Sequence, residues 1–134
     1  MPVRVILDAN FLMIPAQFQI DIFQQLTNLF NKRVEMIVLA STRNELQKIA
    51  LGSHPKKKKQ AELALKFVDG KCHLSKIKPK IGETADDLIL RVAKKWRCPV
   101  ATNDRNLRKK LRNISVPVIY LREKSHLALN GWVE

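Results

Sequence analysis

Apolar positions along this chain fall into short continuous runs and into longer stretches with helical spacing. The runs Val3–Leu7 and Met36–Leu39 are rich in β-branched side chains and contain no helical gaps, which predicts two buried strands. Further short strands are expected at residues 72–77, 99–102 and 117–121, and an edge strand or a tail packed on the domain at residues 126–132.

The stretches between these runs repeat apolar residues every three or four positions, as amphipathic helices do. One such stretch opens at Pro15, residues 42–51 predict a helix capped by Thr42 and ended by Gly52, and Thr84 caps another. The apolar stripes that define the helices are Phe18, Ile22, Leu26, Leu29 and Phe30; Ala61, Leu65 and Val68; Leu88, Val92 and Trp96; and Leu107 and Leu111.

Alternating strands and helices imply right-handed crossovers and a mostly parallel sheet that is covered on both faces. We therefore expect a three-layer α/β/α fold with about five strands. Its 134 residues are the size of one domain, 1–134, and show no internal repeat or linker.

Composition and the first residues narrow the class of protein. With 46 % hydrophobic and 28 % charged residues, the chain is typical of a globular protein. The opening apolar run meets Asp8 too soon to form a signal peptide or a membrane span, so we expect a cytoplasmic protein without membrane contact. Cys72 and Cys98 are expected to be reduced and packed, and the scattered histidines do not favour a zinc site.

The charge balance points to a polyanionic partner. Twenty-five Lys and Arg against twelve Asp and Glu give a formal net charge of +13, and nucleic acid is the commonest cytosolic polyanion. A merely basic protein, or one that packs against an acidic partner, is the alternative. Charge alone does not distinguish binding from cleavage.

The few acidic residues gather at equivalent places in the predicted fold. Asp8 ends the first strand, Glu45 starts the helix after the second, Asp86 and Asp87 start the helix before residues 99–102, and Asp104 follows that strand. Functional groups of such sheets collect beyond the carboxyl ends of the strands. Asp86 reaches that edge only if the start of its helix lies across the cleft.

Carboxylates that meet in one pocket repel each other and raise each other's pKa unless a cation lies between them. Mg²⁺ or Mn²⁺ suits a site made only of carboxylates. Such an ion activates water and polarises a phosphodiester, alone or as one of a pair. Together with the basic surface, this set of residues predicts a nuclease.

Purely structural roles are alternatives for each acid except Asp8. Glu45 could form a capping box with Thr42, and Asp104 could cap the helix that contains Leu107. Thr84-x-x-Asp87 has a similar spacing, which leaves Asp86 free to point at a metal. An acid that ends a buried strand, by contrast, is unfavourable without a partner.

Other classes of site find no support in the sequence. The four glycines form no phosphate-binding loop, no serine lies in an elbow motif, and no Cys–His pair is placed for nucleophilic catalysis. A phospho-accepting receiver domain would carry adjacent acids after the first strand, whereas Asp8 is followed by Ala9 and Asn10.

Four motifs in register resemble the signature blocks of PIN-domain ribonucleases. They are Val5-Ile6-Leu7-Asp8-Ala9-Asn10-Phe11, Ser41-Thr42-x-x-Glu45-Leu46, Thr84-Ala85-Asp86-Asp87-x-Ile89 and Ala101-Thr102-Asn103-Asp104-x-x-Leu107. Residues 85–87 and 101–121 look closest to the branch that processes precursor ribosomal RNA of the small subunit. Asn10 stands where many toxin-type members have Ser or Thr, and the Cys-x-x-Cys of another ribosome-processing branch is absent.

The resemblance implies a Mg²⁺- or Mn²⁺-dependent endoribonuclease. Its catalytic metal ligands would be Asp8, Glu45, Asp86 and Asp104, supported by Asn10, Asp87 and Thr102. RNA is the expected partner, with ribosome-assembly proteins as further partners and a homodimer compatible with the sequence. The alternatives are a toxin-type ribonuclease of a toxin–antitoxin pair and an inactive RNA-binding or assembly module.

Basic residues are assigned to RNA more loosely. Lys56, Lys57, Lys58 and Lys59 form either a solvated face or phosphate contacts, while other cations lie beside the predicted ligand segments, namely Arg43, Arg105, Arg108, Lys109 and Lys110. Trp96 and Trp132 are expected in the core rather than as platforms for base stacking.

Overall fold

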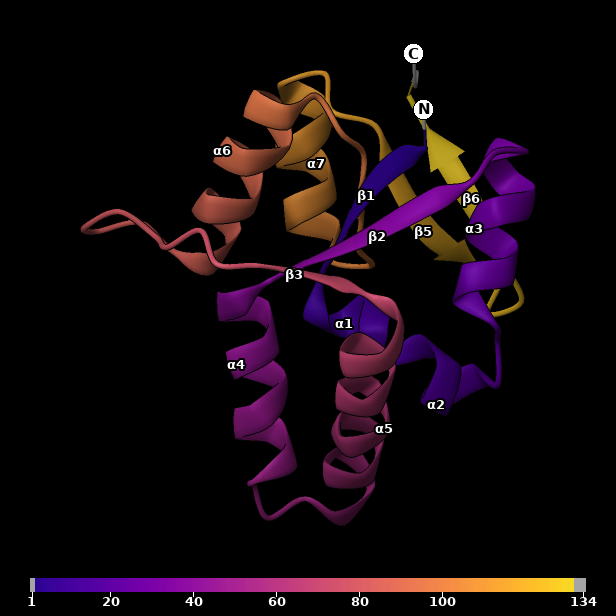
Figure 1. The fold of residues 1–134 in the computed structure, drawn as a ribbon, viewed down its shortest axis with the longest axis vertical. Helices are drawn as coiled ribbons and strands as arrows, with labels where there is room; N and C mark the ends of the chain where they lie inside the picture. Colours follow the sequence, from indigo (N-terminus) through magenta and orange to yellow (C-terminus); the bar gives the residue numbers. More distant parts are fainter. Residues whose placement is uncertain (1, 132–134) are drawn as a thin grey trace.

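A single six-stranded sheet forms the centre of the protein, described here by a computed structural model that covers residues 2–131. The strands are β1 (Val3–Leu7), β2 (Val34–Leu39), β3 (His73–Ser75), β4 (Val100–Ala101), β5 (Val118–Arg122) and β6 (His126–Asn130). Their order is β3-β2-β1-β4-β5-β6, with β1 to β5 parallel and β6 antiparallel to β5. Figure 1 labels all of these strands except β4. The predicted mostly parallel α/β sheet is confirmed, with an antiparallel edge strand added.

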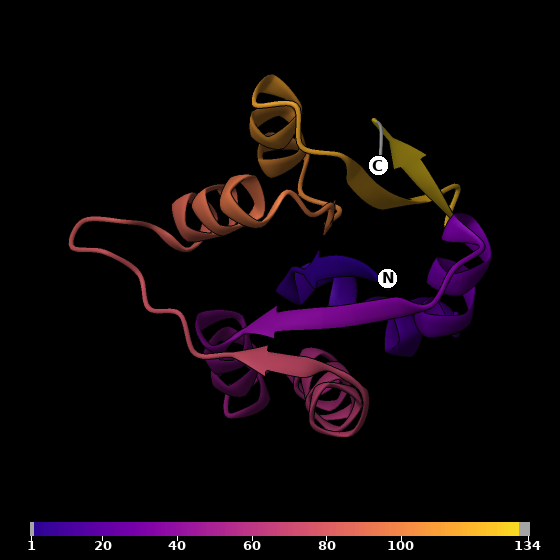
Figure 2. The same ribbon diagram turned by 45° about the horizontal axis from the view of Figure 1, so that its top comes forward.

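Helices cover both faces of the sheet and complete the three layers. They are α1 (Ala9–Leu12), α2 (Ile14–Phe18), α3 (Ile22–Phe30), α4 (Ala40–Ala50), α5 (Pro55–Lys71), α6 (Ala85–Trp96) and α7 (Arg105–Asn113). Successive side chains of a strand point to opposite faces, so Val5 and Leu7 pack with α1 to α5, whereas Ile6 packs with α6 and α7. Figure 2 shows α6 and α7 on one side of the strands and α4 and α5 on the other.

The stretch that opens at Pro15 is two helices, not one. Gln19 adopts a left-handed conformation (φ 55°) and ends α2, and the Asp21 carboxylate then caps α3 by accepting from the Gln24 amide at 3.0 Å. Phe18 is consequently 36 % exposed instead of joining the buried stripe. The break was not predicted because Phe18 and Ile22 lie four residues apart, a spacing that also fits one continuous helix.

The start of α4 also differs from the prediction. This helix begins at Ala40 directly after β2, so Thr42 lies inside it and is buried, and no side chain caps its amino end. The predicted cap at Thr42 and the alternative capping-box role of Glu45 are therefore both wrong. The second capping box is confirmed, because Thr84 Oγ1 accepts from the Asp87 amide and Asp87 Oδ2 accepts from the Thr84 amide, both at 3.1 Å.

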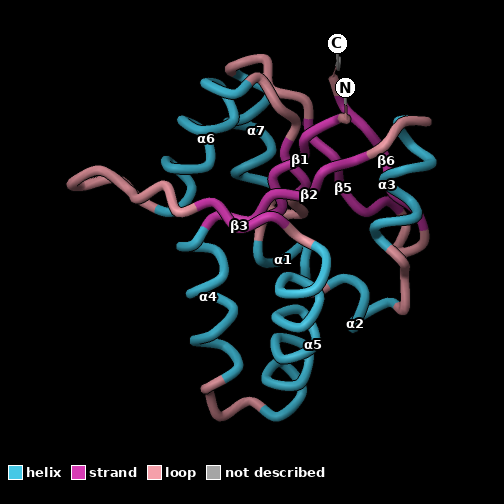
Figure 3. The backbone as a smooth tube through the Cα atoms, viewed as in Figure 1, coloured by secondary structure: helices cyan, strands magenta, loops and turns pink. Residues whose placement is uncertain are grey.

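The connection between β3 and α6 projects from the body of the molecule (Figure 3). Its base is fixed by an ion pair in which Arg91 Nε lies 2.8 Å from Glu83 Oε2, and Arg91 Nη2 also donates to the Lys78 carbonyl at 3.2 Å. This anchoring holds the first turn of α6, and thus Asp86, in a defined position.

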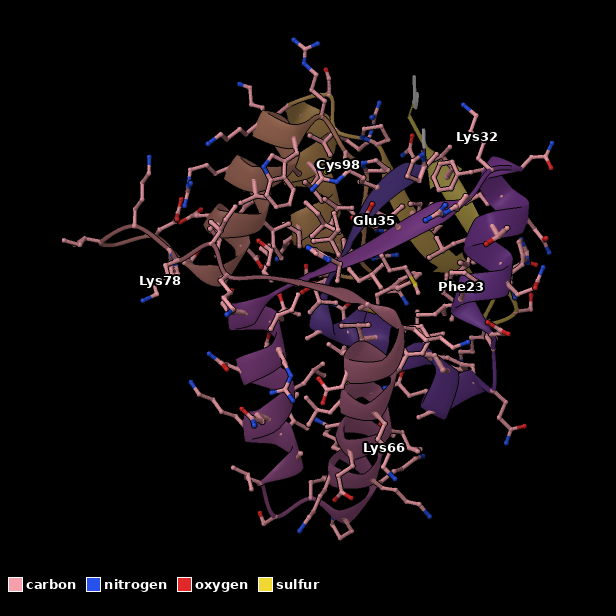
Figure 4. The ribbon with its side chains drawn as sticks, in the orientation of Figure 1. Phe23, Lys32, Glu35, Lys66, Lys78 and Cys98 are labelled. Carbon is pink, nitrogen blue, oxygen red and sulfur yellow. The ribbon has the colours of Figure 1, made fainter. Side chains whose placement is uncertain are left out.

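Both cysteines are free, as predicted, and burial raises the pKa of the Cys72 thiol to about 12 and that of Cys98, which Figure 4 labels, to about 11. Trp96 packs partly buried against the α6–α7 core, whereas Trp132 lies outside the described residues. No helix within residues 2–131 combines the length and hydropathy that crossing a membrane requires.

A pair of leucines from one helix tests this core. Leu46 is fully buried and Leu51, at the carboxyl end of α4, is 84 % exposed. We expect Leu46→Ala to lower the free energy of unfolding by about 2–5 kcal/mol, because it leaves a cavity against the sheet. Leu51→Ala should change it by less than about 0.5 kcal/mol. Urea unfolding monitored by circular dichroism measures both, and equal effects would contradict the burial of α4.

Candidate functional site

The order of the sheet creates a crevice between its two central strands. Strand order reverses between β1 and β4, which lie side by side and parallel. Ligands of open α/β sheets bind outside the carboxyl ends of the strands at such a switch point. Asp8 directly follows β1 and Thr102 directly follows β4, so both residues lie at this place.

A cavity of about 200 Å³ occupies the crevice. Its lining residues are Asp8, Ala9, Asn10, Met13, Thr42, Glu45, Ile49, Ala85, Asp86, Ile89 and Asp104. The fold therefore brings together the four acids that the sequence analysis predicted as ligands, from four separate segments. Asp87 does not line the cavity because its carboxylate caps α6.

Asp8 is the most buried of these acids, at 9 % exposure. Its Oδ1 accepts from the Ala9 amide at 2.8 Å, and its Oδ2 accepts from the Thr102 hydroxyl at 2.8 Å and from Asn10 Nδ2 at 3.2 Å. With both oxygens acting as acceptors, the contacts suit an ionised carboxylate. The predicted supporting residues Asn10 and Thr102 thus contact Asp8 directly.

A second set of contacts ties this network to the loop after β4. Asn10 Oδ1 accepts from the Asn103 amide at 3.1 Å, and Thr102 Oγ1 accepts from the Asp104 amide at 3.1 Å. Asn103 Oδ1 in turn accepts from the Leu121 amide of β5 at 2.8 Å. Asn103 belongs to one of the four motifs, but its role was not predicted because the strand to which it is bonded is distant in sequence.

Asp104 combines two roles that the sequence analysis treated as alternatives. Its Oδ1 caps α7 by accepting from the amides of Asn106 at 2.8 Å and Leu107 at 3.1 Å. The residue also lines the acidic cavity, and its Oδ2 forms no hydrogen bond within the described part of the chain. One oxygen therefore fixes the side chain and leaves the other for a ligand.

The carboxylates oppose one another's ionisation. Burial raises the pKa of Asp8 above its ordinary value, and the charges of Asp86 and Asp104 raise it further, although the Thr102 and Ala9 hydrogen bonds act the other way. Burial also raises the pKa of Glu45, with Asp8 and Asp86 adding to it. The pKa of Asp86 is raised by burial and by Asp104, against an opposing effect from Lys110.

The chemistry of these donors fits a divalent cation with oxygen ligands. Within residues 2–131, no group of three or more His, Cys, Asp or Glu is arranged closely enough to hold an ion by itself. Mg²⁺ keeps several waters and is commonly held by one or two carboxylates together with substrate phosphates. An ion held in this way would offset both the burial and the mutual repulsion that raise the pKa values of Asp8, Glu45 and Asp86.

The predicted RNA contacts separate into different places. Arg43 forms a bidentate pair with Asp69 of α5, at 3.0 and 2.9 Å, and lines no cavity described here. Lys56 to Lys59 lie at the start of α5, at the end of the α4–α5 pair remote from the sheet (Figure 1). Lys110 acts on the pKa of Asp86. The remaining three line a second cavity, namely Arg105, Arg108 and Lys109.

Positive charge alone does not locate a nucleic-acid site. Lysines are spread over the surface; for example, Lys32, Lys66 and Lys78 lie on three separate parts of the molecule (Figure 4). Three further lining residues were not predicted from the sequence: Thr42 in the acidic cavity, and Arg112 and Tyr120 in the second cavity. Helical spacing of Arg112 with the earlier basic residues of α7 was the signal that could have found it.

Known proteins resemble this chain over almost its full length. Ribonuclease VapC4 of Methanocaldococcus jannaschii is 29 % identical over 131 residues, which cover 97 % of this chain and 98 % of that protein. Ribonuclease VapC9 of Archaeoglobus fulgidus is 29 % identical over 118 residues, 88 % of this chain and 82 % of that protein. The solved structure of the PIN domain endonuclease Utp24 is 27 % identical and superposes with a TM-score of 0.81 over 99 % of this chain and 95 % of that one.

A family model described as a PIN like domain matches residues 5–124. That span begins in β1 and includes all four acids of the crevice. This chain belongs to the PIN-like domain family of nucleases.

Proposed function

We propose that this protein is a Mg²⁺- or Mn²⁺-dependent endoribonuclease that acts in the cytoplasm. The observation that carries the proposal is the convergence of Asp8, Glu45, Asp86 and Asp104 on one crevice at the switch point of the sheet. Two relatives named as ribonucleases and a net charge of +13 support RNA as the substrate.

The reaction that we propose is hydrolysis of a phosphodiester. A water oxygen bonds to phosphorus, one P–O ester bond breaks, and the leaving oxygen takes a proton. A bound divalent ion would polarise the phosphate and lower the pKa of the water. The chain's own residues hold the proposed metal ligands in place: Thr102 and Asn10 fix Asp8, and the α7 cap fixes Asp104. Glu45 lines the crevice and has a raised pKa, which makes its carboxylate a suitable proton acceptor.

For the RNA target, we propose structured RNA such as a precursor of ribosomal RNA. The support is the likeness of residues 85–87 and 101–121 to that branch of the family, together with the extent of the superposition on the endonuclease Utp24. Ribosome-assembly proteins would then be among its partners.

The toxin half of a toxin–antitoxin pair is the second candidate, because the two archaeal relatives carry VapC names. Arrest of growth on expression, relieved by one small partner that blocks the crevice, would favour this candidate. An inactive RNA-binding module is less well supported, because the acids of the crevice are all present.

Two substitutions test catalysis while keeping the fold. The side chain of Asp86 makes no hydrogen bond among those found in residues 2–131, and asparagine at position 104 can still cap α7 through its carbonyl oxygen. We expect Asp86→Asn and Asp104→Asn each to slow metal-dependent RNA cleavage by about 100-fold or more. Asp8→Asn is a poorer test, because an amide nitrogen would face one of the donors that now bond Asp8.

Cleavage of a labelled structured RNA with Mn²⁺ measures catalysis. Binding of the same RNA in EDTA measures its affinity separately. Glu62→Gln is the matched control, since it removes one carboxylate charge from the exposed surface of α5. Cleavage by all four proteins at one rate would indicate a contaminating nuclease and would sink the proposal.

The raised pKa of Asp86, caused first by burial and then by the charge of Asp104, predicts that its ionised carboxylate destabilises the metal-free protein. A carboxyl whose pKa is raised in the folded state weakens folding above that raised pKa, and the penalty disappears as the pH falls below its ordinary value of 3.8. We therefore expect Asp86→Asn to raise the Tm of the metal-free protein by a few degrees at neutral pH and not at low pH.

Asp87→Asn is the control for this experiment, because capping lowers the pKa of Asp87 and its charge supports the fold. It should lower Tm slightly at neutral pH. Added Mn²⁺ should raise the Tm of the wild type and of Asp87→Asn, and that of Asp86→Asn much less. The reverse order of the two variants would assign the ligand role to Asp87.

A further inference from the structure

Helix α7 carries a basic stripe beside a large cavity. Arg105, Arg108, Lys109 and Arg112 follow the i, i+3, i+4, i+7 spacing of one helix face, and Leu107 and Leu111 are buried on another. The four cations line a cavity of about 580 Å³ between α7 and strands β5 and β6, here called the α7 groove. Asn113, Val118, Tyr120 and Asn130 complete its lining.

No acidic residue neutralises this stripe in the described part of the chain. The ion pairs found there join Arg43 to Asp69 and Arg91 to Glu83, both outside the groove. Like charges at positions i and i+4 of a helix repel one another, so the stripe weakens α7 unless an external anion approaches it. A polyanion would relieve this repulsion.

Two of the guanidinium groups are held in defined positions. Arg112 Nη1 donates to the Val116 carbonyl at 3.2 Å, and Gly131, at φ +113°, leaves beside it the space that a Cβ would fill. The Arg108 guanidinium stacks on the Tyr120 ring with its central carbon 4.5 Å from the ring centroid. The groove therefore offers a planar Arg–aromatic pair in addition to charge.

The α7 groove begins where the acidic cavity ends. Asp104 lines the acidic cavity and Arg105, its neighbour in sequence, lines the groove. At 1.5 Å per residue, the stripe from Arg105 to Arg112 extends about 10 Å, the length of about three stacked nucleotides. One extended strand could contact both cavities.

We propose that the α7 groove binds a single-stranded segment of the RNA that is cut in the acidic crevice. Its phosphates would lie on Arg105, Lys109 and Arg112, and a base would stack on the Arg108–Tyr120 pair. An unstacked base offers the flat face that such a pair binds, whereas a duplex hides it. This inference rests on the proposed ribonuclease function for its choice of polyanion.

A pair of double variants tests the charge contacts. Arg105→Gln/Lys109→Gln removes two charges from the groove, and Lys94→Gln/Lys95→Gln removes two exposed charges from the last turn of α6. Binding of a labelled single-stranded RNA is measured in EDTA at several salt concentrations. We expect the groove variant to reduce the slope of log K against log salt by about 1.4, which corresponds to two phosphate contacts, and the α6 variant to leave it unchanged. Equal slopes in the two variants would overturn the proposal.

The aromatic pair needs its own test. Tyr120→Leu should weaken RNA binding by about tenfold with little change in the salt slope, and Tyr120→Phe should retain the affinity because it keeps the ring. A polyglutamate peptide of matched charge serves as the competing ligand. Equal affinity of that peptide, with the same loss in Tyr120→Leu, would make the groove a site for acidic protein segments and would refute the RNA assignment.

Cleavage kinetics separate a failure of this inference from a failure of the proposed function. The groove variant should show a raised KM on a long RNA, and a much smaller change in KM on an RNA too short to reach the groove. An unchanged KM on the long RNA would refute the RNA-binding role of the groove without contradicting the proposed ribonuclease function. Groove-dependent RNA binding without cleavage of any RNA refutes the ribonuclease and supports the groove.

Discussion

The burial of one carboxylate at the end of the central strand β1 organises the whole site. Asp8 is 9 % exposed, and three hydrogen bonds from Ala9, Thr102 and Asn10 hold its two oxygens. A buried charge is tolerated only when it is bonded in this way. Thr102 follows β4 and donates to Asp8, which follows β1, so this hydrogen bond joins the two strands on either side of the crevice. Thr102 also accepts from the Asp104 amide.

Among the acids at the starts of α6 and α7, helix capping and lining of the crevice are separate roles. Asp87 closes a capping box with Thr84, which leaves Asp86, one residue earlier, to line the crevice. Asp104 divides the same duties between its two oxygens, since Oδ1 caps α7 and Oδ2 faces no partner in residues 2–131. Backbone amides at the two helix starts thus fix the side chains of Asp87 and Asp104, which gives rigid support to a site that holds charges close together.

Two concentrations of like charge lie next to each other on this fold. The acids of the crevice raise one another's pKa, and the cations of α7 repel along the helix. Each arrangement lowers the stability of the isolated protein, and a ligand of opposite charge relieves it. The acidic crevice and the basic α7 groove adjoin at two consecutive residues, since Asp104 lines the crevice and Arg105 lines the groove.

Local patterns in the sequence determined the strands, the α6 capping box and the acids that follow strands, because each depends on residues close together in the chain. The α/β class and the expected position of Asp8, Glu45 and Asp104 at one edge followed from these patterns, since parallel strands share one carboxyl edge. The tertiary structure decided that Asp86 joins them in the crevice. Only the tertiary structure decided that Thr42 lines the crevice, that Arg43 pairs with Asp69, and that α7 forms a groove with β5 and β6. Those outcomes depend on contacts between segments distant in sequence, and no spacing along the chain encodes them.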